Sequence, residues 1–309
     1  MSPFLVGAIA VAAASASHPP TAEAETPLFA RRFPTVWSAV AATLENDPVV
    51  VAFGELHQTR STAGVPSALR RFTEEIWPEV AGRFSHLVVE TWIATGRCGD
   101  AERSATEDLQ RATERPVATG GEIETLLRAA AARGIAPRIL SVTCADYASM
   151  LGTGPGVDYD RALRVTERAL EATTLAALKE RWRWRSPVRP GLAIYGGALH
   201  NDVYPLPGLA PYSFAPKLMA ATLGRYVEID LIVPEYAAQT PSVRAQPWWR
   251  LYLRARSKGR SQGRGRGPAP APGSDAGPAP PGVGADATVM ISRGPRSFVI
   301  ILPWHDQTP

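Results

Sequence analysis

Short apolar runs that alternate with amphipathic stretches are the feature that most limits how this chain can fold. The runs occupy residues 49–53, 85–90, 139–143, 190–196 and 226–233. Short runs rich in β-branched and aromatic residues are typical of buried strands. Because strands that alternate with helices form mainly parallel sheets with helices on both faces, the expected fold class is α/β.

The stretches between the runs have helical periodicity and complete this pattern. We expect helices over residues 34–45, 66–84, 100–112, 121–133, 158–185 and 213–223. Pro78 should bend the second of these or mark its last turn, because proline cannot continue a helix without a kink. Two final strands, 287–291 and 297–302, predict a C-terminal antiparallel hairpin that completes the sheet edge.

Titratable side chains follow three of the predicted strands. The first strand runs into Gly54-Glu55-Leu56-His57, the second ends at Glu90, and the fourth is followed by Gly197-Ala198-Leu199-His200. The spacing Gly-x-x-His therefore occurs twice, each time at a strand end. Since ligands of open α/β sheets bind at the carboxyl ends of the strands, we expect these side chains to converge at one edge of the sheet.

Two imidazoles and two carboxylates suit two routes to hydrolysis. Their nitrogen and oxygen atoms match zinc, manganese or cobalt, which lower the pKa of a bound water, with His57, Glu90 and His200 as candidate ligands. Without a metal, a histidine oriented by Glu55 can act as general base on water. Each residue taken singly is more often a helix cap or a satisfied core partner, but the recurrence at strand ends favours a shared site.

Weaker candidates surround this set. Asp146 and Asp202 could orient a ligand histidine, or could simply cap helices. His86 begins its strand and should lie at the opposite edge, in a structural role. His305 follows the last strand, but no second motif supports it.

The strand-end motifs resemble the superfamily that contains the ChaN-like haem-binding proteins, the TIKI/TraB proteins and the erythromycin-esterase proteins. The resemblance lies in Phe53-Gly54-Glu55-Leu56-His57, in Val88-Val89-Glu90 and in the second Gly-x-x-His, and covers roughly residues 48–233. It implies an α/β sheet with these residues in one cleft. The Gly-Glu-x-His form is most similar to ChaN, although residues 58–68 lack the further histidine that ChaN-like sequences often carry.

The functions implied by the resemblance differ. TIKI-like proteins are metal-dependent proteases, esterase-like proteins open lactones without a metal, and ChaN-like proteins bind haem. Our first interpretation is an exported, metal-assisted hydrolase of a small-molecule or peptide substrate. The alternative is a haem-binding iron-uptake protein, for which an exposed Tyr195 or Tyr204 would be a candidate ligand. A third is a non-enzymatic extracellular protein whose Arg-rich segment contacts acidic polymers.

Composition limits the partners and the domain organisation. The 309 residues suit one large domain over residues 25–309. The net charge of +4 is local, because Arg250 to Arg266 contains seven basic residues and no acidic one, which leaves the remainder near −3 (4 − 7). No nucleic-acid-binding domain is therefore expected. Residues 257–285 have almost no large apolar side chain and predict a disordered insertion.

The first residues and the cysteines bear on the compartment. Residues 1–24 resemble a signal segment, with a short apolar run and two small-x-small patterns but no basic residue before the run, and the alternative is an Ala-rich tail. The run is too short to cross a bilayer, so no transmembrane segment is expected. Export would permit a disulfide between Cys98 and Cys144, whereas a reducing compartment would leave them as buried thiols.

Overall fold

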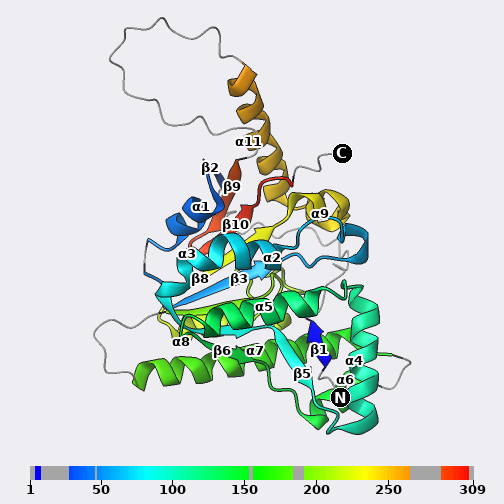
Figure 1. Ribbon diagram of the computed structural model, residues 1–309. Helices are drawn as coiled ribbons and strands as arrows, with labels where there is room; N and C mark the ends of the chain where they lie inside the picture. Colours follow the sequence, from blue (N-terminus) through cyan, green and yellow to red (C-terminus); the bar gives the residue numbers. More distant parts are fainter. Residues whose placement is uncertain are drawn as a thin grey trace, which may run out of the picture.

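A mixed eight-stranded sheet forms the centre of the computed structural model, which describes residues 4–7, 28–45, 47–152, 156–183, 191–264 and 287–305. The strand order is β2-β9-β10-β8-β3-β7-β4-β6 (Figure 1). The parallel strands are β3 (Val50–Glu55), β4 (Phe84–Val89), β6 (Ala136–Ile139), β7 (Gly191–Gly197), β8 (Tyr226–Ile232) and β10 (Ser297–Ile301). The predicted α/β class and mainly parallel sheet are confirmed.

The C-terminal hairpin is confirmed, but its place at the edge of the sheet is not. Strand β9 (Thr288–Gly294) pairs antiparallel with β10, and a further strand, β2 (Phe29–Phe33), pairs antiparallel with β9 and forms the edge. The sequence of β2 contains two adjacent arginines among its five residues, so it lacks the apolar run by which the other strands were predicted.

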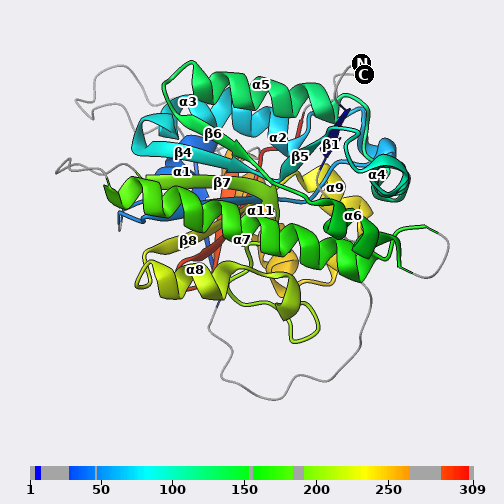
Figure 2. The ribbon, with the colours of Figure 1, turned by 90° about the horizontal axis from the view of Figure 1, so that it is seen from below.

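Helices cover both faces of the sheet, as predicted (Figure 2). The helices α1 (Val36–Thr43), α2 (Ala68–Arg71), α3 (Trp77–Val80) and α5 (Thr119–Ala131) pack on one face, and α7 (Tyr159–Arg183) and α8 (Ala215–Ala221) on the other. Successive residues of a strand point to opposite faces. In β3, Val51 and Phe53 accordingly join the first core, while Val50 and Ala52 join the second.

Two predicted elements differ in detail. The helix expected over 66–84 is interrupted by a π-helical turn, Phe72–Ile76, and Pro78 lies in the first turn of α3. Proline is tolerated there because the amide it lacks has no partner within the first turn. The third strand lies earlier than residues 139–143, because Thr143 already caps α6 (Cys144–Leu151) and only the preceding residues pair with β4.

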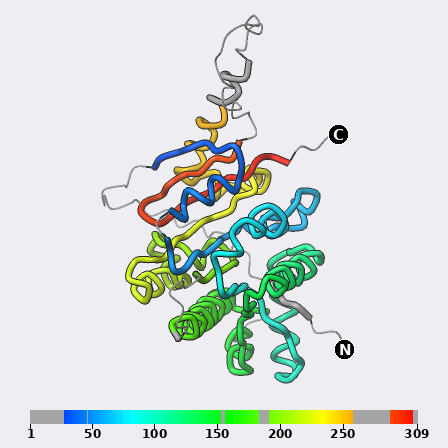
Figure 3. The backbone as a smooth tube through the Cα atoms, turned by 60° about the vertical axis from the view of Figure 1, so that its left-hand side comes forward, coloured from blue at the N-terminus to red at the C-terminus, as the bar shows by residue number. Residues whose placement is uncertain are grey.

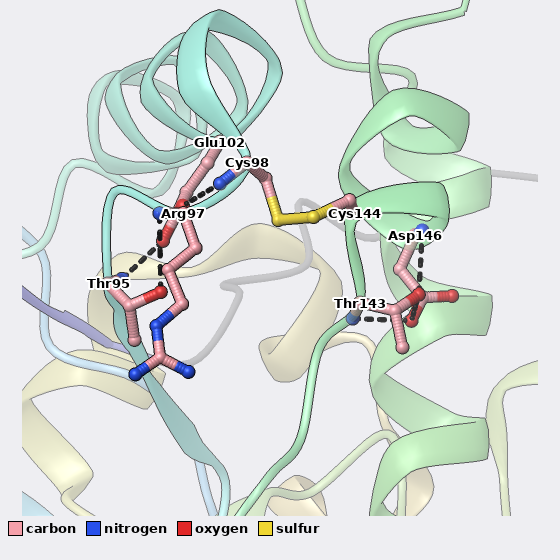
Figure 4. Close-up of a disulfide and its surroundings, with 7 residues drawn as sticks. All are labelled: Thr95, Arg97, Cys98, Glu102, Thr143, Cys144 and Asp146. Carbon is pink, nitrogen blue, oxygen red and sulfur yellow. Dashed lines mark hydrogen bonds between the residues drawn. A yellow bond between two sulfur atoms is a disulfide. The ribbon is translucent and has the colours of Figure 1, made fainter.

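A disulfide ties α6 to the segment that follows β4. Strand β5 (Thr91–Ala94), which pairs antiparallel with β1 (Phe4–Gly7), leads into α4 (Gly99–Thr113). Cys98 and Cys144 are bonded, with 5.1 Å between their Cα atoms (Figure 4). Glu102 accepts hydrogen bonds from the backbone N–H groups of Thr95 and Cys98, the latter at 3.0 Å. Asp146 bonds the backbone N–H of Thr143 at 2.9 Å, so it caps α6, the structural one of its two predicted roles.

Helix α11 (Pro247–Arg264) corrects part of the predicted insertion. It follows the short helices α9 (Pro234–Gln239) and α10 (Pro241–Arg244), and it continues through residues 257–264, which were expected to be disordered. Aromatic side chains in its first turns pack against the sheet and support the helix at its base. Residues 265–286, and the predicted signal segment outside β1, lie outside the described residues.

Among the described residues, no helix is both long enough and apolar enough to cross a membrane.

Candidate functional site

Three adjacent parallel strands bring the predicted residues to one edge of the sheet. Glu55 on β3 lies opposite Gly197 on β7, and Val89 on β4 lies opposite Tyr195, which places Glu90 beside Gly196. Glu55, His57, Glu90 and His200 are all buried, with 1–7% of each residue exposed. The predicted convergence at the carboxyl ends of the strands is therefore observed.

Glu55 is the centre of a buried hydrogen-bond network. Its Oε1 lies 2.6 Å from Nδ1 of His57 and accepts a hydrogen bond from Arg115 at 2.9 Å, while its Oε2 accepts one from the Tyr195 hydroxyl at 2.7 Å. Burial by itself raises the pKa of a carboxyl group. Here the hydrogen bond and charge of His57, with the charge of Arg115 and the Tyr195 hydroxyl, outweigh it and lower the pKa of Glu55 to about 2.

Arg115 is a member of this network that the sequence did not reveal. It lies in the connection between α4 and α5, just after Glu114, whose left-handed backbone (φ 47°) turns the chain at the end of α4. The backbone carbonyl of Glu114 accepts a hydrogen bond from Arg60, which ties the connection to the segment after β3. The Arg115 guanidinium also lies against Nδ1 of His57. Nothing in the sequence of a polar loop distinguishes this arginine from its neighbours.

Glu90 faces the second Gly-x-x-His motif. Its Oε2 accepts a hydrogen bond from the Gly197 N–H at 2.6 Å, and its Oε1 lies 3.8 Å from Nε2 of His200. A Cβ added to Gly196 would stand 2.5 Å from Glu90 Oε2. Glycine at that position therefore lets the buried carboxylate lie against β7.

The partners of the two histidines determine which ring nitrogen carries the proton. Nδ1 of His200 lies 2.8 Å from the carbonyl oxygen of Tyr212, which can only accept, so the hydrogen is on Nδ1. Nδ1 of His57 lies between the ionised Glu55 carboxylate, which only accepts, and the Arg115 guanidinium, which only donates; because Arg115 also donates to Glu55, we assign the hydrogen of the ring to Nδ1, facing Glu55. In the neutral form of each ring, Nε2 is then an unprotonated acceptor.

Three buried acceptor atoms in this cluster have no hydrogen-bond partner among the described residues: His57 Nε2, Glu90 Oε1 and His200 Nε2. A Cβ added to Gly197 would stand 2.8 Å from His57 Nε2 and 3.5 Å from Glu90 Oε2, so the glycine leaves a space that both groups face. Glu90, Gly197 and His200 also line a narrow crevice, which is too small to hold a water molecule without a shift of its walls. An acidic proton, a water or a cation is the kind of ligand that unpaired buried acceptors bind.

The donor atoms of the cluster fit a metal ion only in part. Two ligands that are each about 2.1 Å from a zinc ion lie at most about 4.2 Å apart, so His200 Nε2 and Glu90 Oε1 are within reach of one ion. Among the described residues, however, no group of three or more His, Cys, Asp or Glu side chains is close enough together to hold an ion. The donor types and their unpaired atoms fit a divalent ion, whereas the third ligand, His57, is not grouped with the other two.

The two tyrosines considered as haem ligands lie in different surroundings. Tyr195 is buried and donates to Glu55, on the strand face that packs into the core, so it is not the exposed tyrosine that haem binding would require. Burial and the neighbouring Glu55 charge raise its pKa well above the usual value. Tyr204 is 46% exposed, and its hydroxyl donates to the carbonyl of Pro295 in the β9–β10 hairpin.

A second buried cluster lies on the neighbouring strand β8. Arg293 binds Glu228 at 2.7 Å and Asp202 at 2.5 Å, so Asp202 belongs to this acidic cluster. Burial and the nearby carboxylates raise the pKa of Glu228 well above its usual value. Burial raises the pKa of Asp230 to about 6, although the Arg293 charge opposes this.

The other two histidines that the structure describes lie outside the candidate site. His86 is buried on β4 beside Ser85 and Glu180, as expected for a structural residue. The backbone N–H of His305 donates to Glu235, and its side chain is exposed.

Comparison of the chain with protein-family models, with curated proteins and with solved structures finds no match.

Proposed function

We propose that this protein is a hydrolase whose reaction takes place at the Glu55, His57, Glu90 and His200 cluster. The observation that carries the proposal is the set of three buried, unpaired acceptor atoms at the ends of adjacent strands. Leaving a buried polar atom without a partner costs about 1–3 kcal/mol. A site with three such atoms is suited to bind a proton-bearing or cationic ligand, and water is the nucleophile of hydrolysis.

His57 is the proposed general base. Glu55 holds its ring through Nδ1, leaving Nε2 free to take a proton from a water molecule. The ionised Glu55 then stabilises the imidazolium that forms, as a buried carboxylate does for a catalytic histidine. Arg115 and the Tyr195 hydroxyl keep Glu55 ionised and fixed in this orientation.

Glu90 and His200 are proposed to bind and orient the reacting groups. Each has one atom fixed by the backbone, at Gly197 and Tyr212 respectively, and one atom free. A divalent ion, where bound, would be held by Glu90 and His200, and would polarise a carbonyl group or acidify water. The protein residues position the substrate and move the proton in either case.

The proposed substrate presents a small reacting group, such as an ester, lactone or peptide carbonyl, to a narrow site. The crevice lined by Glu90, Gly197 and His200 is too narrow to hold a water molecule without a shift of its walls, far below the roughly 300–1,000 Å³ typical of pockets that enclose a whole ligand. This favours hydrolysis over the alternative of haem binding in the same cluster, because a haem macrocycle needs a larger cavity.

The test measures hydrolysis of aryl esters, lactones and fluorogenic peptides by purified protein, together with its metal content by mass spectrometry. His57→Ala should lower hydrolysis by roughly 10²–10⁴-fold, the usual contribution of a general base. Gly197→Ala should have a comparable effect without changing any charge, because its Cβ fills the space against His57 Nε2. His305→Ala, which alters an exposed histidine, is the matched control.

The same preparations decide between the alternatives. Activity that survives Glu90→Gln and His200→Ala would overturn the shared site. A Soret band after haem addition that is lost in these variants, with no hydrolysis of any substrate, would favour the haem-binding alternative. Metal that co-purifies with the wild type and is lost in Glu90→Gln would add the divalent ion to the proposal.

We also propose that the protein acts after export to an oxidising compartment. The Cys98–Cys144 disulfide supports this, because such bonds persist outside reducing cells. Fractionation of cells that express the full chain, followed by thiol labelling, tests it: the protein should be found outside the cytoplasm, with both cysteines protected.

A further inference from the structure

Helix α11 extends beyond the body of the molecule at the end where β2 and β9 lie (Figures 1 and 3). Its base is held by aromatic contacts. Trp248, Trp249 and Tyr252 are buried, and the Tyr252 hydroxyl accepts a hydrogen bond from Trp304 at 2.7 Å. The Arg256 guanidinium lies 4.6 Å from the centre of the Trp304 ring. These contacts fix which face of the helix is turned to solvent.

The solvent face of α11 is basic and has an apolar residue in its middle. Arg250, Leu253 and Arg254 are three and four residues apart, so they share one side of the helix, and all three are exposed. Leu253 is 45% exposed. We call these three residues the α11 face.

The positive charge of the α11 face is not balanced nearby. Between Tyr236 and Arg264 the sequence has seven basic residues and no acidic one. Arg250 and Arg254 form no ion pair with any described residue, in contrast to Arg103 on α4 and Arg128 on α5, which each bind an acidic residue of their own helix. The α11 face therefore has free cationic groups at a protruding end of the molecule.

The neighbouring edge strand β2 does not extend this face. β2 contacts α11 on the side of Ala30, whereas the exposed Phe29 and Arg31 alternate with it and are on the opposite face of the sheet. Exposed large apolar side chains among arginines are what an interfacial surface presents to a bilayer: the guanidinium groups meet lipid phosphates, and the apolar groups enter the acyl boundary. A nucleic acid would use the arginines but would leave an aliphatic side chain such as Leu253 without a contact.

We propose that the α11 face binds the surface of bilayers that contain anionic phospholipids. This binding is peripheral, is independent of the proposed hydrolase reaction, and holds the rest of the sheet beside the membrane. The attraction should weaken as the salt concentration rises, because exposed charges are screened.

The test is co-sedimentation of the full-length protein with vesicles of phosphatidylcholine, with and without phosphatidylglycerol. The wild type should bind only the anionic vesicles. Each arginine near an anionic surface contributes about a fivefold increase in partitioning, so R250Q/R254Q should lower it by roughly 30-fold. R103Q/R128Q removes the same net charge from exposed arginines elsewhere and is the matched control. Leu253→Ser should weaken binding at high salt, where only the apolar contact remains.

Each outcome decides the proposal. Salt-sensitive binding that is lost in R250Q/R254Q and kept in R103Q/R128Q supports it. Equal losses in both double variants would show attraction by net charge alone and would overturn it, as would absence of binding to anionic vesicles. Retention on heparin or DNA without vesicle binding would assign the face to a soluble polyanion instead. Far-ultraviolet circular dichroism of every variant shows that the fold is intact.

Discussion

Two buried polar clusters lie on adjacent strands of the same sheet and shift the pKa values of their carboxyl groups in opposite directions. Glu55 on β3 has its pKa lowered to about 2, whereas Asp230 on β8, next to Gly54 in the strand register, has its pKa raised to about 6. Both carboxyl groups are buried. Burial therefore cannot explain the difference, because it raises the pKa of each.

The number of donors for each carboxylate explains it. Glu55 interacts with His57, Arg115 and Tyr195, so one carboxylate has several donors. In the acidic cluster, three carboxyl groups share one positive charge: Glu228, Asp230 and Asp202 all lie near the guanidinium of Arg293. A buried group of three carboxyls and one cation is stabilised by retaining a proton. The first cluster therefore favours the ionised form of its carboxyl group, and the second favours the protonated form.

The most damaging change to this arrangement should be Glu55→Gln. It leaves the buried Arg115 guanidinium without its carboxylate, and breaking a buried pair in this way costs about 3–5 kcal/mol. Urea unfolding followed by circular dichroism measures the loss in the free energy of unfolding. A loss below about 1 kcal/mol would mean that Arg115 finds other partners and that the ion pair does not organise the cluster.

Removal of the disulfide should have the next largest effect. It should weaken the region around the Glu55 cluster and leave the acidic cluster on β8 unchanged. The Cys98–Cys144 bond closes a loop of sequence separation 46, which contains Arg115, so Cys98→Ser/Cys144→Ser should lower stability by about 2–4 kcal/mol. Hydrogen exchange in denaturant-free buffer at neutral pH should show weaker protection of the backbone amides in α4 and unchanged protection in β8. Equal loss in β8 would show that the loop and the acidic cluster unfold together.

The pH dependence of stability should distinguish the clusters by its sign. The raised pKa of Asp230 means that its contribution is present below its unfolded value of 3.8 and is lost as the pH rises through about 6. The expected loss is on the order of 2–3 kcal/mol. Glu55 acts oppositely: its contribution is present above 4.5 and is lost as the pH falls through about 2. Urea midpoints between pH 4 and pH 7 should therefore fall as the pH rises, and a steady rise would contradict the assignment.

Asp230→Asn should have the smallest effect at about pH 4 to 5, where Asp230, with its pKa of about 6, is protonated. An amide imitates the protonated carboxyl, so the free energy of unfolding should change by less than about 1 kcal/mol. Its informative consequence is a flatter pH profile between pH 4 and pH 7 than that of the wild type. An unaltered profile would assign the titration to other groups, with Glu228 as the first to examine by the equivalent Glu228→Gln variant.

Some features of the site could be predicted from the sequence because they are local. His57 follows β3 by two residues, and Glu90 follows β4 by one, so a correct strand prediction already places both at one edge of a parallel sheet. Arg115 could not be predicted in this way. It is 60 residues from Glu55 and reaches it from the loop between two helices.

The face of a strand to which a side chain points was harder to predict from the sequence than the strand itself. The haem-binding alternative requires an exposed tyrosine, but Tyr195 pairs in register with Phe53 and shares its inward face, where it donates to Glu55. A strand covered on both faces by helices has no solvent side, so the polarity of a tyrosine does not indicate its exposure. Helix α11 was not predicted at all, because its base is supported by contacts with the sheet that no local composition reveals.

The sequence by itself determined the alternation of strands and helices, and with it the α/β class and the edge at which Glu55, His57, Glu90 and His200 meet. Tertiary structure decided the rest: which ring nitrogens are free, which carboxyl groups are charged, and that Arg115 and Tyr195 belong to the network. The physical reason is the distance along the chain between the residues that interact. Periodicity and strand ends are set by neighbours along the chain, whereas protonation and hydrogen bonding depend on groups that only the packed sheet brings together.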